Sequence, residues 1–285
     1  MSVSVFEAIR SGSSFLKERG FEDALESSEQ LLSHILSKPK WALYLNSDTT
    51  VSKEKETLFF DLLKKRSHHY PIQYLIGRVP FRYVDLNVKQ GTFIPRPETE
   101  LLVDVVLDRL RERGETAPKI LDIGTGTGCL AISLVCEIRD AHAIATDRSK
   151  TSLKLASLNA AKNQVERRIS FRHTSFWEGI AEVFDIVVSN PPYLSKKDLS
   201  ELSPEVRFEP KGALDGGSDG LDCYRYIAQE ISQILASGGL LALEVGVTQA
   251  KEVEKLLCQN GFGKIQTTKD FAGVKRIVSA RLLVK

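Results

Sequence analysis

The chain has 285 residues, of which 42% are hydrophobic and 27% are charged, a composition typical of a soluble globular protein. Its net charge of +2 argues against binding long nucleic acid through phosphate contacts alone, and no apolar run approaches the roughly 18–20 residues of a membrane span. The first residues include acidic side chains and lack the apolar core of a signal peptide, so we expect a cytoplasmic protein with no membrane partner.

The cysteines do not suggest a metal site or a disulfide framework. Cys129, Cys136, Cys223 and Cys258 form no C-x-x-C pair, and the five histidines do not cluster with them. We therefore expect reduced thiols, as in cytosolic proteins, and no bound metal.

Residues 1–75 carry apolar side chains at three-to-four spacing in three or four segments, which predicts a small helical bundle. Gly12 is expected to break the first helix, and Pro71 to end the last one. In residues 76–95, the alternation of Phe81 with Tyr83 and of Leu86 with Val88 predicts a β-hairpin linker, with residues 89–91 as turn material.

Residues 96–285 are expected to form a second domain. It begins with a helix that has Pro97 near its first turn, and from Pro118 onward short apolar runs alternate with helical segments. This alternation predicts an α/β domain with a parallel sheet covered on both faces. The last two runs have no helix between them, so they should pair as an antiparallel hairpin at one end of the sheet. The expected strands are 119–124, 141–147, 168–175, 184–190, 238–246, 264–270 and 275–284.

A glycine-rich loop follows the first of these strands, with the sequence Gly124-Thr125-Gly126-Thr127-Gly128. Its G-x-G-x-G spacing differs from the G-x-G-x-x-G of dinucleotide-binding proteins, and no Lys-Ser/Thr pair of a P-loop follows it. This spacing after an acidic strand end is typical of methyltransferases that use S-adenosyl-L-methionine and release S-adenosyl-L-homocysteine.

Polar and aromatic residues at neighbouring strand ends fit the same cofactor. Asp147 ends the second strand, where its two carboxylate oxygens could accept hydrogen bonds from both ribose hydroxyls. Phe176 and Trp177 follow the third strand, where one aromatic ring could stack on the adenine and the other belong to the core. Asp122 could either orient the glycine loop or face the positive end of the cofactor.

The Asn190-Pro191-Pro192-Tyr193 sequence ends a buried strand with a polar amide and two prolines. Asn190 offers a side-chain carbonyl and Pro191 a main-chain carbonyl, and the prolines stiffen the loop that carries both acceptors. Two such acceptors could hold a planar NH₂ group and stabilise the positive charge that develops on its nitrogen during methyl transfer. Tyr193 would pack against the planar substrate group and align it.

These motifs, together with residues 71–77, 93–100, 209–210 and 213–225, resemble bacterial release factor glutamine methyltransferases, the family also called PrmC or HemK. The resemblance implies a Rossmann-like class I methyltransferase domain and an N-terminal domain that helps to dock the release factor. It implies a glutamine substrate in the Gly-Gly-Gln tripeptide of class I peptide chain release factors. The implied cofactor contacts are Gly124 to Gly128, Asp147, Phe176 and Asn190, and the implied glutamine contacts are Asn190, Pro191, Pro192 and Tyr193.

Three other functions are compatible with parts of this pattern. A ribosomal-protein glutamine methyltransferase would share the same core. A nucleic acid adenine or cytosine N-methyltransferase would need a basic cleft and a flipped base, which the near-neutral charge disfavours. A non-catalytic binding module would not need both motifs. Arg96 and Glu98 could also line the cofactor pocket, and the Gly216–Gly217 region could shape the wall around a bound substrate loop.

Overall fold

The computed structural model describes residues 3–45, 47–112, 114 and 116–283. The chain divides into two compact units. One comprises Met1–Gly77 with Ser203–Phe208, and the other Arg78–Leu202 with Glu209–Lys285. Within the described ranges, no helix combines the length and the hydropathy that crossing a membrane would require.

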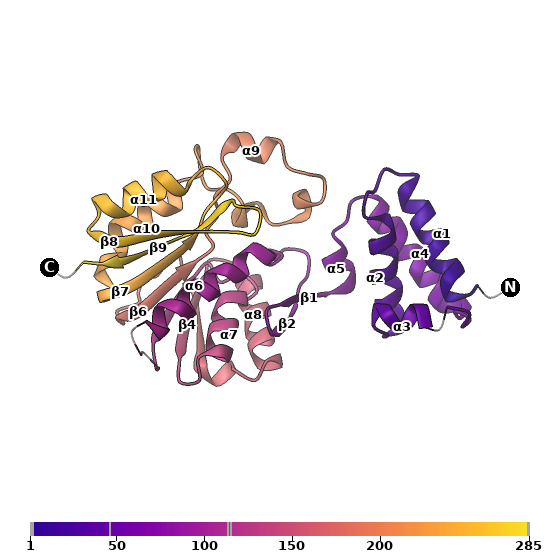
Figure 1. Ribbon diagram of the computed structural model, residues 1–285, viewed down its shortest axis with the longest axis horizontal. Helices are drawn as coiled ribbons and strands as arrows, with labels where there is room; N and C mark the ends of the chain where they lie inside the picture. Colours follow the sequence, from indigo (N-terminus) through magenta and orange to yellow (C-terminus); the bar gives the residue numbers. More distant parts are fainter. Residues whose placement is uncertain (1–2, 46, 113, 115, 284–285) are drawn as a thin grey trace. The chain divides into compact units, whose positions relative to one another are not determined.

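The first unit is a helical bundle, as predicted, built from α1 (Val5–Lys17), α2 (Ala24–Leu36), α3 (Lys40–Leu45), α4 (Lys53–Ser67) and α5 (Ile72–Ile76) (Figure 1). The prediction that Gly12 breaks the first helix is wrong. α1 runs through Gly12, and it packs so closely on α4 there that the Phe59 ring lies 2.8 Å from the place of a Cβ, which explains a glycine inside the helix. The prediction for Pro71 also needs correction, since α4 ends at Ser67, before this proline.

A short segment from the second half of the chain belongs to the helical unit. Arg66, whose side chain is buried, pairs with Glu205 at 2.6 Å and with Asp23 at 2.9 Å. The Phe208 ring packs edge-on against Tyr70, with 5.1 Å between centroids. Residues 203–208 therefore belong to the helical unit, and the chain then returns to the second unit.

The second unit begins with the predicted hairpin, formed by β1 (Arg78–Phe81) and β2 (Val84–Asn87). Its turn lies at Arg82 and Tyr83, whereas residues 89–91, the predicted turn, follow β2. Arg82 has a positive φ of 51°, and its guanidinium pairs with Glu137 at 2.6 Å and with Asp104 at 2.7 Å. These ion pairs hold the turn against helices of the same unit.

A seven-stranded sheet forms the centre of the second unit, in the order β5-β4-β3-β6-β7-β9-β8. Five strands are parallel, while β9 runs antiparallel to both β7 and β8, which confirms the predicted terminal hairpin. The strands are β3 (Lys119–Ile123), β4 (His142–Asp147), β5 (Ile169–His173), β6 (Phe184–Ser189), β7 (Leu235–Glu244), β8 (Phe262–Lys269) and β9 (Lys275–Leu282).

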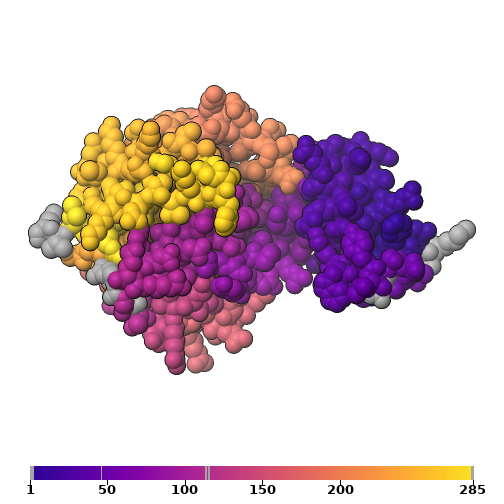
Figure 2. Space-filling view, viewed as in Figure 1, coloured from indigo at the N-terminus to yellow at the C-terminus, as the bar shows by residue number. Residues whose placement is uncertain are grey.

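Helices cover both faces of this sheet (Figure 1). Alternate strand residues face opposite sides, so Ile120 packs in one core cluster and Leu121 in the other. α6 (Glu100–Arg111) and α7 (Cys129–Glu137) pack on one face, together with α8 (Lys150–Lys162), whereas α10 (Asp222–Glu230) and α11 (Ala250–Gln259) pack on the other. The space-filling view shows the C-terminal residues, in yellow, gathered on one part of this unit's surface (Figure 2).

Candidate active site

Four parallel strands end side by side at the carboxyl edge of the sheet, and three of them end at or directly before a predicted site residue. Ile123 in β3 pairs with Thr146 in β4 and with Ser189 in β6, and Ser189 pairs with Leu243 in β7. The next residues along these strands are Asp147, Gly124, Asn190 and Glu244. Strand order reverses between β3 and β6, and ligands of open α/β sheets bind at such a switch point.

The glycine loop connects β3 to α7 through three residues with positive φ. Gly124, Gly126 and Gly128 have φ values of 71°, 58° and 87°, which side-chain-bearing residues rarely adopt. At Gly128 a Cβ would also lie 2.8 Å from Ile132. Gly124 has open space around the position of a Cβ, so a ligand can approach the backbone there.

Asp122 stabilises this loop from the protein interior. Its Oδ2 accepts hydrogen bonds from Thr125 Oγ1 at 2.6 Å and from the backbone N–H of Ala131 at 3.2 Å. Burial raises the pKa of Asp122 to about 7, and these hydrogen bonds oppose the increase. The contacts match the first of the two roles considered for Asp122, orientation of the glycine loop.

Asp147 lies beside the glycine loop and contacts it directly. One carboxylate oxygen accepts from Gly126 N at 2.9 Å, and the other accepts from Ser149 N at 2.7 Å. Each oxygen of a carboxylate can accept more than one hydrogen bond, so both retain the capacity to bind a diol. Burial raises the pKa of Asp147, whereas these backbone hydrogen bonds lower it.

The two aromatic residues after β5 have different surroundings. Trp177 is buried in the core that α10 and α11 cover. Phe176 is only partly buried, and its ring centroid lies 4.2 Å from that of Tyr226. Trp177 thus takes the core position, and Phe176 retains the surface that an adenine contact would use.

Asn190 begins a loop that is held on several sides. Its Nδ2 donates to Thr99 Oγ1 at 3.2 Å, and the preceding Ser189 Oγ donates to Ile123 O at 2.8 Å. The main-chain oxygen of Tyr193 accepts from Gln249 Nε2 at 2.8 Å. This hydrogen bonding fixes the loop beside the strand that leads into the glycine loop.

Two glycines of the 213–225 segment pack against the same loop. A Cβ at Gly216 would lie 2.7 Å from Pro192 O, and one at Gly220 would collide with Tyr193 O. Leu194 N also donates to Leu214 O at 2.9 Å, and Gly216 N donates to Leu194 O at the same distance. The glycines therefore permit a close approach of backbone to backbone behind the Asn-Pro-Pro-Tyr loop.

The Tyr193 ring is partly buried and packs against the core. Burial raises the pKa of Tyr193 to about 12, and the nearby Glu244 carboxylate adds to the increase. The phenol therefore remains neutral near pH 7, so it can pack against a ligand but cannot act as a general base there.

Two residues at this edge were not found from the sequence. Thr99 lies at the N-terminus of α6, and Glu244 is the last residue of β7; both are buried. Glu244 could have been recognised as an acid at the end of an apolar strand, but its neighbours depend on the strand order. Arg96, which we considered for the cofactor pocket, pairs with the buried Glu209, and Glu209 Oε2 accepts from Ile94 N at 3.1 Å.

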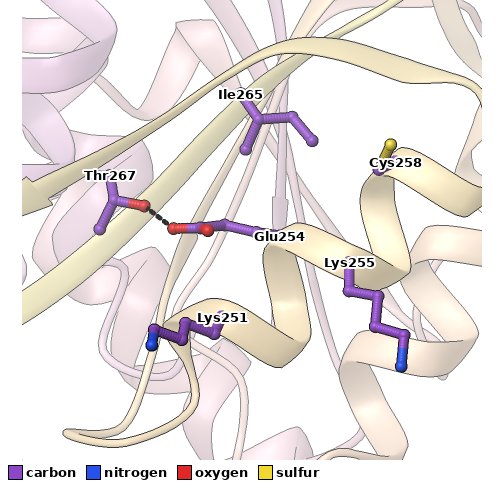
Figure 3. A pocket seen from close by; sticks show the side chains of 6 residues that line it. All are labelled: Lys251, Glu254, Lys255, Cys258, Ile265 and Thr267. Carbon is purple, nitrogen blue, oxygen red and sulfur yellow. Dashed lines mark hydrogen bonds between the residues drawn. The ribbon is translucent and has the colours of Figure 1, made fainter.

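A surface hollow elsewhere on the second unit does not include any predicted site residue (Figure 3). It lies between α11 and β8, where Thr267 Oγ1 donates a hydrogen bond to Glu254. The residues that line this hollow are Lys251, Glu254, Lys255, Cys258, Ile265 and Thr267.

Among the described residues, no three His, Cys, Asp or Glu side chains are grouped so that they could hold a metal ion.

Comparison with known proteins identifies relatives along nearly the whole chain. Two family models match, the PrmC N-terminal domain over residues 7–77 and the Methyltransferase small domain over residues 97–205. The release factor glutamine methyltransferase of Geobacter sulfurreducens is 36% identical over 270 residues, which cover 94% of this chain and 93% of that protein. The protein of the same name from Clostridium acetobutylicum is 34% identical over 98% of both chains.

Solved structures show the same methyltransferase fold. A methyltransferase from Pyrococcus furiosus superimposes with a TM-score of 0.53 at 16% identity, covering 70% of this chain and 90% of that one. The catalytic domain of hMettl16, solved in complex with an RNA hairpin, gives a TM-score of 0.57 at 12% identity, covering 84% and 86%. At such low identity these likenesses concern the fold alone.

Proposed function

The chain belongs to the release factor glutamine methyltransferase family, and we propose that it transfers a methyl group from S-adenosyl-L-methionine to the N5 side-chain nitrogen of a glutamine. The substrate is the Gly-Gly-Gln tripeptide of class I peptide chain release factors, whose methylation modulates translation termination. The observation that carries this proposal is the placement of the glycine loop, Asp147 and Asn190 at one sheet edge.

The residues at this edge fit S-adenosyl-L-methionine, which supplies a methyl group on a positively charged sulfur. The backbone of Gly124 to Gly128 gives close access, and Asp147 retains acceptor capacity for the ribose hydroxyls. Phe176 offers a partly exposed ring for the adenine. Asn190 borders both the cofactor and the substrate positions.

Asn190, Pro191 and Tyr193 carry the chemistry in this proposal, and Pro192 shapes the glutamine position with them. Asn190 Oδ1 and the Pro191 carbonyl accept the two N–H bonds of the glutamine amide, which fixes its nitrogen and stabilises developing positive charge. The stiff proline pair and the hydrogen bonds around Tyr193 keep these acceptors in place before substrate arrives. No ionised base is needed for the attack, because the leaving group is a good one.

The partner in this proposal is a protein, and the proposed location follows from it. Class I release factors act in translation, so we place the reaction in the cytoplasm. The helical unit, which includes the region matched by the PrmC N-terminal model, helps to dock the release factor.

The test is a methyl-transfer assay with radiolabelled S-adenosyl-L-methionine. Purified protein is incubated separately with a class I release factor, with total ribosomal proteins and with DNA. We expect label in the release factor, and none in a release factor whose Gly-Gly-Gln glutamine is replaced by alanine. Label in ribosomal proteins alone would make the chain a ribosomal-protein methyltransferase, and label in DNA alone would contradict protein glutamine methylation.

A further inference from the structure

A buried acid, Glu244, lies behind Asn190 at the carboxyl edge of the sheet. Glu244 ends β7, and the residue before it, Leu243, pairs with Ser189, the residue before Asn190. Glu244 is 2% exposed and Thr99 is 1% exposed, so neither side chain is accessible to bulk water. Asn190 is only half-buried, which leaves part of it available for a ligand.

Polar contacts link these three side chains, and one of them is a hydrogen bond between Asn190 and Thr99. Asn190 Nδ2 donates to Thr99 Oγ1 at 3.2 Å. Burial disfavours the charged form of the Glu244 carboxyl, and the nearby polar groups of Thr99 and Asn190 favour it. Glu244 Oε2 itself is buried without a hydrogen-bond partner, so the carboxyl has capacity to accept from both. The Glu244 backbone is held as well, because its carbonyl oxygen accepts from Tyr224 Oη at 2.8 Å.

The direction of these hydrogen bonds follows from the chemistry of the groups. An ionised carboxylate can only accept, so it needs the NH₂ end of Asn190 and the hydroxyl hydrogen of Thr99. The two ends of a carboxamide have nearly the same shape, and only their partners determine which end faces inward. With Nδ2 held inward, Oδ1 faces outward as an acceptor.

We propose that Glu244 is a positioning residue that selects the orientation of the Asn190 amide, presenting Oδ1 rather than Nδ2 to the substrate NH₂ group. This inference rests on the proposed glutamine methylation and deepens it. A flipped Asn190 would direct its own N–H groups at the substrate N–H groups, which would remove one acceptor from the reacting nitrogen. Thr99 assists, because a hydroxyl that donates its one hydrogen to the carboxylate can only accept from Asn190, and it therefore also selects the Nδ2 end.

Protonation of Glu244 should weaken this selection, because a neutral carboxyl group can donate a hydrogen bond to Asn190 Oδ1. Burial raises the pKa of Glu244 to about 7. Several other groups act on this carboxyl or are acted on by it. The positive charge of Arg276 favours the charged form of Glu244, and the negative charge of Glu98 disfavours it. Glu244 in turn raises the pKa values of Tyr193, Tyr224 and Cys129.

The first experiment compares wild type with Glu244→Gln, a variant of the same size that can donate as well as accept. We expect kcat for release factor methylation to fall roughly 10- to 100-fold, with the KM for S-adenosyl-L-methionine nearly unchanged. The wild-type kcat should rise with pH through an apparent pKa near 7, and this step should be absent in Glu244→Gln. An unchanged kcat, or a retained pH step, would contradict the proposal.

Asp122→Asn is the matched control, because Asp122 is also buried and its pKa is also raised to about 7. The pH step in kcat should persist in this variant. A second control adds Glu244→Gln to Asn190→Ala. Since Glu244 is inferred to act through Asn190, the double variant should be no slower than Asn190→Ala alone, and multiplied losses would overturn the inference.

A measurement without turnover separates this inference from the proposed function. The side-chain NH₂ signals of Asn190, assigned by their loss in Asn190→Ala, can be followed by NMR as pH varies. They should shift with a midpoint near pH 7 in wild type and stay constant in Glu244→Gln. If wild type fails to methylate the release factor but the NH₂ signals titrate in this way, the glutamine substrate is wrong and the positioning role stands; signals that do not titrate would refute that role.

Discussion

Asp122 and Glu244 are two buried carboxyl groups near the carboxyl ends of β3 and β7, and burial raises the pKa of each to about 7. Their partners differ. Asp122 accepts from the adjoining chain, Thr125 and Ala131, and so shapes a backbone loop. Glu244 interacts with the side chains of Thr99 and Asn190, which come from distant parts of the sequence. In the mechanism that we propose, one buried carboxyl group supports the cofactor loop and the other orients the amide that holds the substrate.

We therefore expect the two halves of the site, the glycine loop with Asp147 and the loop that begins at Asn190, to respond separately to mutation. Changes around the glycine loop should alter cofactor affinity, and changes around Asn190 should alter the rate of transfer at saturating cofactor. A variant in one half that changes the quantity assigned to the other half would show that the two halves are coupled.

The largest effect is expected for Asn190→Ala. Loss of one acceptor for the developing charge should lower kcat roughly 10²- to 10³-fold, because such preorganised groups act mainly in the transition state. Steady-state methylation of the release factor, together with calorimetric titration of S-adenosyl-L-methionine, measures both quantities. Retained turnover would remove Asn190 from the mechanism, and complete loss of cofactor binding would show that it serves mainly the cofactor half.

Asp147→Asn is expected to have an intermediate effect that is confined to the cofactor half. The amide retains one oxygen but loses the charge and one acceptor, so cofactor affinity should fall about 10-fold, as expected for a charged hydrogen bond of ~1.5 kcal/mol. Calorimetric titration measures the Kd, and kcat at saturating cofactor should change little. A normal Kd with a reduced kcat would assign Asp147 to the wrong half.

The last effect concerns stability rather than activity, and here the two carboxyls should behave alike. A carboxyl whose pKa is raised on folding stabilises the protein below its unfolded pKa, and this stability is lost as pH rises through the folded pKa. Glu244 should therefore lower the free energy of unfolding by ~1.4 kcal/mol per pH unit between about pH 5 and 7, relative to Glu244→Gln.

Urea unfolding at several pH values measures this difference, and Asp122→Asn should show the same trend. The two variants would then share a pH dependence of stability, while only Glu244→Gln loses the pH step in kcat. A difference between variant and wild type that stays constant from pH 5 to 8 would show that the carboxyl does not titrate in this range.

The sequence alone determined the order of elements and the two motifs of the second unit. Apolar runs of strand length alternate with amphipathic helices, and local patterns of this kind reflect burial on both faces of a sheet. The glycine spacing and the Asn-Pro-Pro-Tyr loop could be read because each is a short continuous stretch whose backbone requirements belong to its own residues.

Which of these residues contact one another depends on the tertiary structure. The pairing of β6 with β7 brings Glu244 next to Asn190, and the start of α6 brings Thr99 to both, although these residues lie far apart in the chain. Packing against Phe59 keeps Gly12 inside a helix that its propensity alone would interrupt. Sequence periodicity records whether a side chain is buried, whereas the partner it meets depends on strand order and long-range packing.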